Sequence, residues 1–195
     1  MKRCFGVGWP VLLSQSDNPK RKLPYTLEFS HNGASWICVH PASANQLVEM
    51  ALKKKMVEPL ASYTTYRREV RYGQEQSRID FLLEGKGGAC CYVEVKSVSM
   101  IDDTGRFAIF PDSISKRGQK HLRELMYCVE KGSSAAALFV IQRTDIEMFR
   151  AAQEIDSEYA KLLLEAKDLG VQFYAYQTTG DPFAYELQTP LKIQF

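Results

Sequence analysis

Two acidic residues and one lysine fall where the strands of a hairpin would place them side by side. The segment 77–98, SRIDFLLEGKGGACCYVEVKSV, alternates apolar and polar residues on either side of a glycine-rich turn. With the turn centred near Gly87, Asp80 lies opposite Glu94, and Lys96 follows on the same face. Carboxylates paired in this way have Cβ atoms about 4.5–5.5 Å apart and repel each other. The arrangement therefore predicts a cation between them, either the Lys96 ammonium or, better, a divalent metal.

The same alternation assigns every residue of the first strand to a face. It places Asp80 with Arg78 and Leu82 on one face and puts three apolar residues on the other, namely Ile79, Phe81 and Leu83. Charged residues also alternate along exposed hairpin faces that have no function. A solvated charged face is therefore the alternative interpretation of this triplet.

The spacing D-x(13)-E-x-K resembles the active site of the PD-(D/E)xK nuclease superfamily. That resemblance implies Mg²⁺ held by Asp80 and Glu94, with Mn²⁺ as a substitute, and Lys96 positioning the attacking water. The residue types suit this chemistry, because Mg²⁺ prefers oxygen ligands and keeps several waters, so that one or two carboxylates suffice. A bound metal lowers the pKa of a coordinated water and neutralises charge on the phosphate.

Composition sets the broad class of the protein. The chain has 195 residues, 45% of them apolar and 11% aromatic, which is enough for a sizeable buried core. A net charge of +2 is too small to indicate nucleic-acid binding by itself, so such a surface must come from local clusters. The five cysteines lack metal-type spacing and indicate reduced thiols in a cytoplasmic protein. No apolar run approaches the roughly 18 residues that span a bilayer, and we expect no membrane association.

Short strands are predicted at 9–14, 25–30 and 35–40, joined by turns and ending at the break Pro41-Ala42. The first turn carries a basic run, which either meets nucleic-acid phosphates or is a solvated loop: Lys20, Arg21 and Lys22.

A helix is predicted next, capped by Ser43 or Asn45. It leads into a polar strand at 66–72. Within that strand Glu69 has two interpretations. It is either an acidic neighbour of Asp80, or it forms an ion pair with a nearby arginine, the candidates being Arg67, Arg71 and Arg78.

The densest positive surface belongs to a helix predicted at 113–131, after a linker that contains Asp112. Its basic residues recur at helical spacing and are candidates for phosphate contacts: Lys116, Arg117, Lys120 and Arg123. A solvated helix face is the alternative. We assign His121 to this basic face, and we expect Gln119 to point into the catalytic site as a further catalytic residue.

The remaining elements complete a recognisable order. A strand buried on both faces is predicted at 135–141, a helix at 157–169 capped by Asp156 and ended by Gly170, and a last strand at 171–177. From Ser43 on the order is α-β-β-β-α-β-α-β, which implies a mixed sheet with a right-handed parallel crossover. The αβββαβ core of the PD-(D/E)xK superfamily has this order, with the aspartate on its second strand and E-x-K on its third.

Several blocks of the sequence resemble the bacterial sugar fermentation stimulation protein family: SDNPKRKLPYT, SRIDFLL, YVEVKSV, FPD and RGQKHLRELM. The resemblance implies a DNA-binding protein with an N-terminal OB-like barrel and a C-terminal PD-(D/E)xK-like domain. We therefore expect an α/β fold with a partial OB-like domain at 1–42, lacking its first strands, and a nuclease-like domain at 43–195. By motif, Asp80, Glu94 and Lys96 take the site, with Asp112 and Gln119 as its neighbours; Glu69 is a further neighbour by its place on the strand 66–72.

Two functions are compatible with these observations. The first is a Mg²⁺-dependent nuclease-type phosphodiesterase that acts on DNA with little sequence preference. The alternative is a non-catalytic DNA-binding regulator of sugar (maltose) metabolism genes. The opposed carboxylates favour the first, because binding alone does not require them. The sequence makes no prediction of the oligomeric state.

Overall fold

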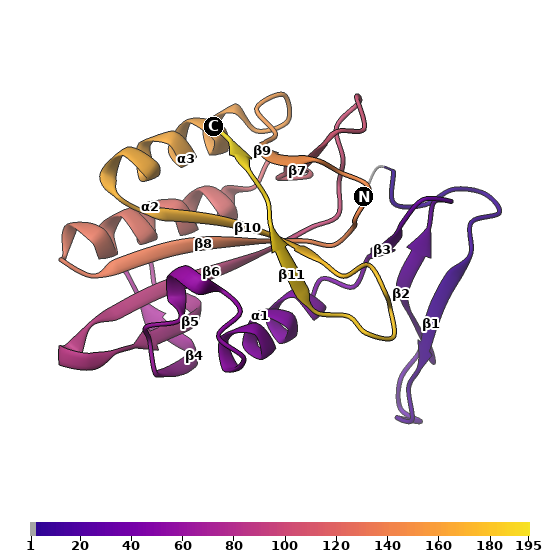
Figure 1. Cartoon of the computed structure of the whole chain (residues 1–195), viewed down its shortest axis with the longest axis horizontal. Helices are drawn as coiled ribbons and strands as arrows, with labels where there is room; N and C mark the ends of the chain where they lie inside the picture. Colours follow the sequence, from indigo (N-terminus) through magenta and orange to yellow (C-terminus); the bar gives the residue numbers. More distant parts are fainter. Residues whose placement is uncertain (1–2) are drawn as a thin grey trace.

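A six-stranded mixed sheet forms the centre of the molecule in this computed structural model, which describes residues 3–195 (Figure 1). In spatial order its strands are β11 (Leu187–Pro190), β10 (Gln172–Thr178), β8 (Ser134–Ile141), β6 (Cys90–Val98), β5 (Ser77–Glu84) and β4 (Thr65–Tyr72). Strand β8 runs parallel to both β6 and β10, whereas β4, β5 and β6 are successive antiparallel neighbours. The predicted mixed sheet and parallel crossover are confirmed.

Helices cover both faces of this sheet. Helix α1 (Ser43–Lys53) lies on one face, and α2 (Lys116–Glu130) and α3 (Ser157–Leu169) lie on the other (Figure 1). Alternate residues of β8 join opposite core clusters, with Phe139 beside α2 and α3 and Leu138 beside α1. Burial on both faces explains why β8 is a continuous apolar run.

Several short strands were not predicted from the sequence. The predicted linker at 100–112 contains β7 (Phe107–Phe110), which pairs with β9 (Met148–Ala151), and β9 in turn pairs with β12 (Ile193–Gln194). Each of these strands has four residues or fewer, too few for a periodic pattern. Two 3₁₀ turns, Glu58–Leu60 and Lys86–Gly88, complete the elements.

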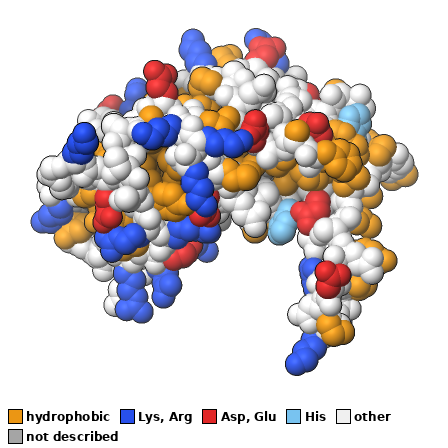
Figure 2. Space-filling model, turned by 60° about the horizontal axis from the view of Figure 1, so that its bottom comes forward, with side chains coloured by type: hydrophobic (Ala, Val, Ile, Leu, Met, Phe, Trp, Pro, Cys, Tyr) orange, Lys and Arg blue, Asp and Glu red, His pale blue; other side chains and the backbone are white. Residues whose placement is uncertain are grey.

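The N-terminal part forms a separate antiparallel sheet, as predicted, of β1 (Val11–Gln15), β2 (Tyr25–His31) and β3 (Trp36–Cys38). Strands β1 and β2 form an arm that stands away from the larger body, with Lys or Arg side chains at its end (Figure 2). Strand β1 is one edge of this sheet, and most of its side chains are exposed.

Buried polar contacts attach the N-terminal sheet to the end of β8. The buried Arg143 guanidinium donates to both Asp145 carboxylate oxygens, at 2.6 and 2.7 Å. Asn32 Nδ2, next to β2, donates to the same carboxylate at 2.7 Å. The Cys38 N–H of β3 donates to the Gln142 carbonyl at 3.0 Å. These bonds fix the base of the arm relative to the central sheet.

Helix termini show one correct prediction and one error. Helix α3 has the predicted bounds, with Asp156 accepting from the Tyr159 N–H at 2.9 Å and Gly170 left-handed at φ +108°. Helix α1 instead begins after Ala42 with no side-chain cap. The Ser43 hydroxyl donates to the His40 carbonyl, and Asn45 reaches β5. The asparagine that was predicted as a cap is thus available to the site described below.

Cys38, Cys90, Cys91 and Cys128 are free thiols, in keeping with the sequence prediction. Across residues 3–195, the helices are too short or too polar for any of them to cross a membrane.

Candidate functional site

The two carboxylates singled out in the sequence lie where β5 and β6 separate. The ladder between these strands runs from Glu84–Cys90 to Phe81–Val93 and stops there, so Asp80 and Glu94 occupy the next opposed positions, as predicted. In place of a ladder bond, Asp80 Oδ2 accepts from the Val95 N–H at 2.7 Å. Its Oδ1 accepts from Asn45 Nδ2 at 2.9 Å. Asp80 is therefore fixed both by β6 and by α1.

Strand β4 is distorted at the residue that faces Asp80. Its ladder with β5 pairs Arg68 with Phe81 and Val70 with Ile79, and omits the intervening Glu69 and Asp80. Glu69 adopts a left-handed backbone at φ +54°, which costs a non-glycine residue about 1 kcal/mol or more.

The distortion moves side chains to the other face of the sheet. Ile79 packs with Leu82 in the core cluster beside α2, whereas Phe81 and Leu83 pack beside α1. The prediction that Ile79 shares a face with Phe81 and Leu83 was therefore wrong. The alternation of both strands breaks at the pair Glu69 and Asp80, which the ladder omits.

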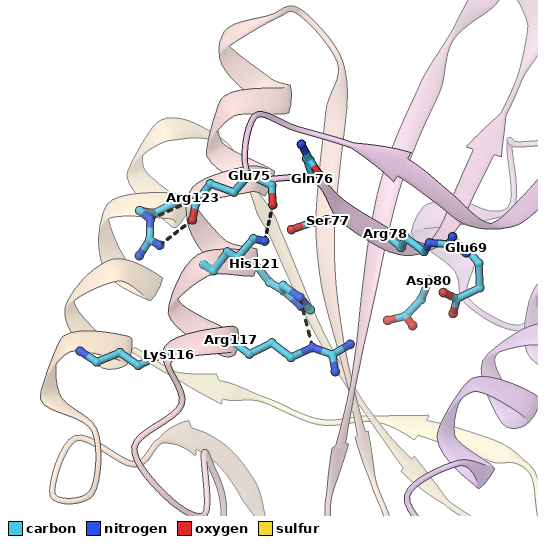
Figure 3. A pocket seen from close by; sticks show the side chains of 11 residues that line it. Glu69, Glu75, Gln76, Ser77, Arg78, Asp80, Lys116, Arg117, His121 and Arg123 are labelled. Atoms are coloured by element: carbon cyan, nitrogen blue, oxygen red, sulfur yellow. Dashed lines mark hydrogen bonds and ion pairs between the residues drawn. The ribbon is translucent and has the colours of Figure 1, made fainter.

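Glu69 lies next to Asp80, and its carboxylate forms no ion pair with another residue of the described range 3–195. Its carboxylate lies beside that of Asp80 at the pocket wall (Figure 3). Arg67 pairs with Glu84 instead, at 2.8 Å, and the described residues include no ion pair that uses Glu69. Three carboxylates, on β4, β5 and β6, thus occupy successive opposed positions across the sheet. Of the two interpretations left open by the sequence, this favours Glu69 as an acidic neighbour of Asp80.

Glu94 is buried, with 4% of its surface exposed, and only one of its oxygens is used. Oε1 accepts from Lys96 Nζ at 2.8 Å and also contacts His121 Nδ1. Oε2 is buried and has no hydrogen-bond partner among the described residues.

The assignment of His121 to the exposed basic face of α2 was wrong, because the side chain is 5% exposed and faces the sheet. Its position, four residues after Arg117 and one before the apolar Leu122, places it at the boundary of the two helix faces. No local signal in the sequence separates these alternatives.

The two carboxyl groups have opposite pKa shifts. Burial, followed by the nearby Glu94 charge, raises the pKa of Asp80 above its ordinary value. Burial alone would also raise the pKa of Glu94, but Lys96 and the His121 contacts outweigh it and hold that pKa below its ordinary value. Environments that separate the pKa values of neighbouring acids are typical of functional sites.

A pocket of about 660 Å³ opens beside these residues. It is lined by Glu69, Glu75, Gln76, Ser77, Arg78, Asp80, Lys116, Arg117, Lys120, His121 and Arg123. We call it the site pocket. Figure 3 shows Arg117 reaching across it from α2 toward Asp80, whereas Lys116 and Arg123 point away. All four predicted basic residues of α2 therefore line the pocket, but they face it differently.

Two of these basic residues hold the turn between β4 and β5. Lys120 Nζ donates to the Glu75 carbonyl, and Arg123 Nε pairs with the Glu75 carboxylate at 3.2 Å. The buried Glu124 accepts from the N–H groups of Gln74 and Glu75 at 2.8 and 2.5 Å. Glu124 was not among the residues predicted from the sequence. It anchors the turn between β4 and β5, which lines the site pocket, to α2.

The structure does not bring the other predicted site residues to the two carboxylates. Gln119 does not line the site pocket, because its buried amide donates to Asp156 at 2.8 and 3.1 Å. The expectation that it points into the site was wrong, since both carboxylate oxygens of the residue that caps α3 hold its amide. Asp112 lines a different pocket of about 230 Å³, together with Cys38 and Ser97.

The basic run of the N-terminal sheet is likewise remote from the site pocket. It lies in the loop between β1 and β2, exposed along its whole length, and comprises Lys20, Arg21 and Lys22. Arg21 Nη2 donates to Thr26 Oγ1 at 2.7 Å, a contact within the arm.

The donors at the site fit a hard divalent cation. Within residues 3–195 no group of three or more His, Cys, Asp or Glu side chains is arranged to hold a metal by itself. Asp80 and Glu94 nevertheless supply two carboxylates, and the buried Glu94 Oε2 accepts no hydrogen bond from any described residue. Since Mg²⁺ commonly takes one or two carboxylates and several waters, this set is sufficient for it.

Comparison with known proteins adds independent information. Residues 42–183 match the family described as "Sugar fermentation stimulation protein RE domain", and residues 1–39 match "SfsA N-terminal OB domain". A "Sugar fermentation stimulation protein homolog" of Shewanella baltica (strain OS185) is 45% identical over 183 residues, which cover 93% of this chain and 77% of that protein. The homolog of Shewanella pealeana is 44% identical over 188 residues, covering 96% and 80%.

One solved structure has the same fold. It is described as "The structure of Pyrococcus Furiosus SfsA in complex with Ca2+". It superposes with a TM-score of 0.84 at 24% identity, covering 95% of this chain and 78% of that chain. The predicted fold class, a nuclease-like α/β domain preceded by an OB domain, is confirmed.

Proposed function

The chain belongs to the sugar fermentation stimulation protein family, and we propose that it is a DNA-binding phosphodiesterase dependent on a divalent metal, Mg²⁺ by preference. One observation carries the proposal. A buried carboxylate, Glu94, has an oxygen without a partner among residues 3–195, and a second carboxylate, Asp80, lies at the next opposed position with a raised pKa. Burying such a pair is costly unless a cation neutralises it.

Each residue then has a separate task in the hydrolysis of a phosphodiester. Asp80 and Glu94 would hold the cation, with Asp80 oriented by Asn45 and the Val95 N–H. When bound, the cation would lower the pKa of a coordinated water and neutralise charge on the phosphate. Lys96, almost buried and held at 2.8 Å from Glu94 Oε1, keeps its ammonium in the site to orient the attacking water. That water forms the new P–O bond as the bond to the leaving oxygen breaks.

The charges around the site pocket support an anionic polymer as substrate. Arg117 extends into the pocket, and Arg78 and Lys116 line it. Arg117 and Lys116 are exposed, so their charges are available to phosphates. The described residues that line the pocket do not form a recognition helix that could read base edges. We therefore expect little preference for particular DNA sequences. The Ca²⁺ recorded with the Pyrococcus furiosus protein supports a divalent cation, because Ca²⁺ and Mg²⁺ both take oxygen ligands.

The test is cleavage of labelled single- and double-stranded DNA with Mg²⁺, with Mn²⁺ and with chelator. We expect metal-dependent cleavage by the natural chain and its loss in Lys96→Ala. Lys86→Ala, an exposed lysine on the turn of the same hairpin, is the matched control and should cleave normally.

Binding without cleavage by all three proteins would contradict the catalytic part of the proposal. It would favour instead a non-catalytic DNA-binding regulator of sugar metabolism genes. Cleavage that persists in Lys96→Ala would contradict the role of that lysine.

A further inference from the structure

Glu94 is held through one oxygen only, and two groups converge on that oxygen. Lys96 Nζ and His121 Nδ1 both contact Oε1, and they lie 3.1 Å from each other. Oε2 is buried and has no hydrogen-bond partner in the part of the chain that the structure describes. A carboxylate whose orientation is fixed from one side presents its other oxygen in a defined direction.

Arg117 identifies the tautomer of His121. Arg117 Nε lies 3.5 Å from His121 Nε2 and directs its N–H toward it. A guanidinium can only donate, so Nε2 must carry the lone pair and the proton must be on Nδ1. Nδ1–H then donates to Glu94 Oε1. The short distance between Nδ1 and Lys96 Nζ follows from their shared acceptor and is not itself a hydrogen bond.

The remaining donors of Arg117 face outward. Its two terminal nitrogens make no hydrogen bond or ion pair with the described residues, while the side chain is exposed and lines the site pocket. A guanidinium offers five N–H donors, so a phosphate can bind the terminal nitrogens without displacing His121 from Nε.

We propose that His121 is a positioning residue of the metal site, held in the Nδ1–H tautomer by Glu94 Oε1 on one side and Arg117 Nε on the other, so that it turns Glu94 Oε2 toward the cation. Arg117 thereby joins the phosphate-binding surface to the carboxylate that holds the metal. This inference rests on the proposed function, because it names Glu94 as a metal ligand. Histidines and other groups behind a metal-bound carboxylate commonly change metal affinity about 10–100-fold.

The tautomer can be observed directly in the full chain. The sequence contains three histidines, so ¹⁵N-labelled histidine gives a simple long-range ¹H–¹⁵N spectrum, assigned by the signal that disappears in His121→Asn. We expect Nδ1–H in the natural chain, and a shift toward Nε2–H in Arg117→Met. Arg123→Met, another exposed arginine of α2, is the control and should leave the signal unchanged. An Nε2–H tautomer in the natural chain, or no response to Arg117→Met, would overturn the inference.

Mn²⁺ binding, measured by calorimetry without nucleic acid, tests the consequence for the metal. His121→Asn keeps an N–H donor near Nδ1 and should bind Mn²⁺ within about threefold of the natural chain. His121→Leu keeps the volume without the donor and should bind about 10-fold or more weakly. Equal affinities in the two variants would overturn the positioning role while leaving the proposed function standing. A natural chain with the Nδ1–H tautomer that binds no Mn²⁺ would overturn both the metal site and the role of His121 in it.

Discussion

Glu69 and Asp80 face each other across β4 and β5 at a point where neither residue joins the ladder. Glu69 has the left-handed φ of +54°, and the apolar side chains on either side of this point pack on opposite faces of the sheet. A strained residue within a strand persists only where the surroundings determine it, and such positions cluster at functional sites. The strain at Glu69 places a third carboxylate beside the pair formed by Asp80 and Glu94.

Replacing Glu69 by glycine separates stability from function. Glycine tolerates a positive φ, so Glu69→Gly should raise the free energy of unfolding by up to about 1 kcal/mol. Loss of the carboxylate should at the same time weaken Mn²⁺ binding. Arg71→Gly, in the same strand with φ outside the positive range, should instead destabilise the protein by about 1 kcal/mol. Urea unfolding of the natural chain and the two variants measures both changes in the free energy of unfolding. A Glu69→Gly variant less stable than the natural chain would contradict the assignment of strain.

The turn between β4 and β5 requires glycine at position 73. A Cβ there would lie 1.5 Å from Glu124 Oε2, and φ is +71°. Gly73→Ala should therefore break the bonds from Glu124 to the turn and cost about 2–4 kcal/mol. Gly87→Ala, at a similar φ of +67° but with open space around it, is the control and should cost about 1 kcal/mol. Equal costs measured by thermal unfolding would show that the Glu124 contact contributes nothing.

Acid should destabilise the cap of α3. Burial would raise the pKa of Asp156, but the N–H groups of Ser115 and Tyr159 and the Gln119 amide outweigh it and hold the pKa below its ordinary value. A lowered pKa gives stability that is present above the unfolded value of about 3.9 and is lost as the pH falls through the folded pKa.

The comparison with Asp156→Asn isolates this effect. Asparagine keeps a capping oxygen but carries no charge, so at pH 7 the variant should be less stable by about 1–2 kcal/mol. The difference in the free energy of unfolding should shrink below about pH 4. A difference that stays constant between pH 7 and pH 3 would contradict the charge-based explanation.

The salt dependence of DNA binding distinguishes the basic residues of α2. Each lost phosphate contact lowers the slope of log K against log salt by about 0.7–0.9. We expect this change in Arg117→Gln, which lies in the site pocket. We expect less in Arg123→Gln, because Arg123 is already paired with Glu75. A slope that is the same for Arg117→Gln and the natural chain would contradict the contact.

Local patterns in the sequence determined the order of elements and the opposition of Asp80 and Glu94. The αβββαβ order follows from helical and strand periodicities that each segment carries by itself. The hairpin register follows from the turn centred on Gly87, and the ladder confirms it. Asp156 caps the start of α3 and Gly170 its end, as predicted, because helix caps are interactions between close neighbours in the chain.

Only the tertiary structure decided which side chains meet at the carboxylates. His121 and Asn45 lie on helices on opposite faces of the sheet, yet they contact Glu94 and Asp80 respectively. Gln119, two residues from His121, turns to Asp156 instead. These choices depend on the packing angle of each helix and on competition among distant polar groups for partners. A single sequence contains no local signal for either, so the carboxylates could be predicted and the residues that orient them could not.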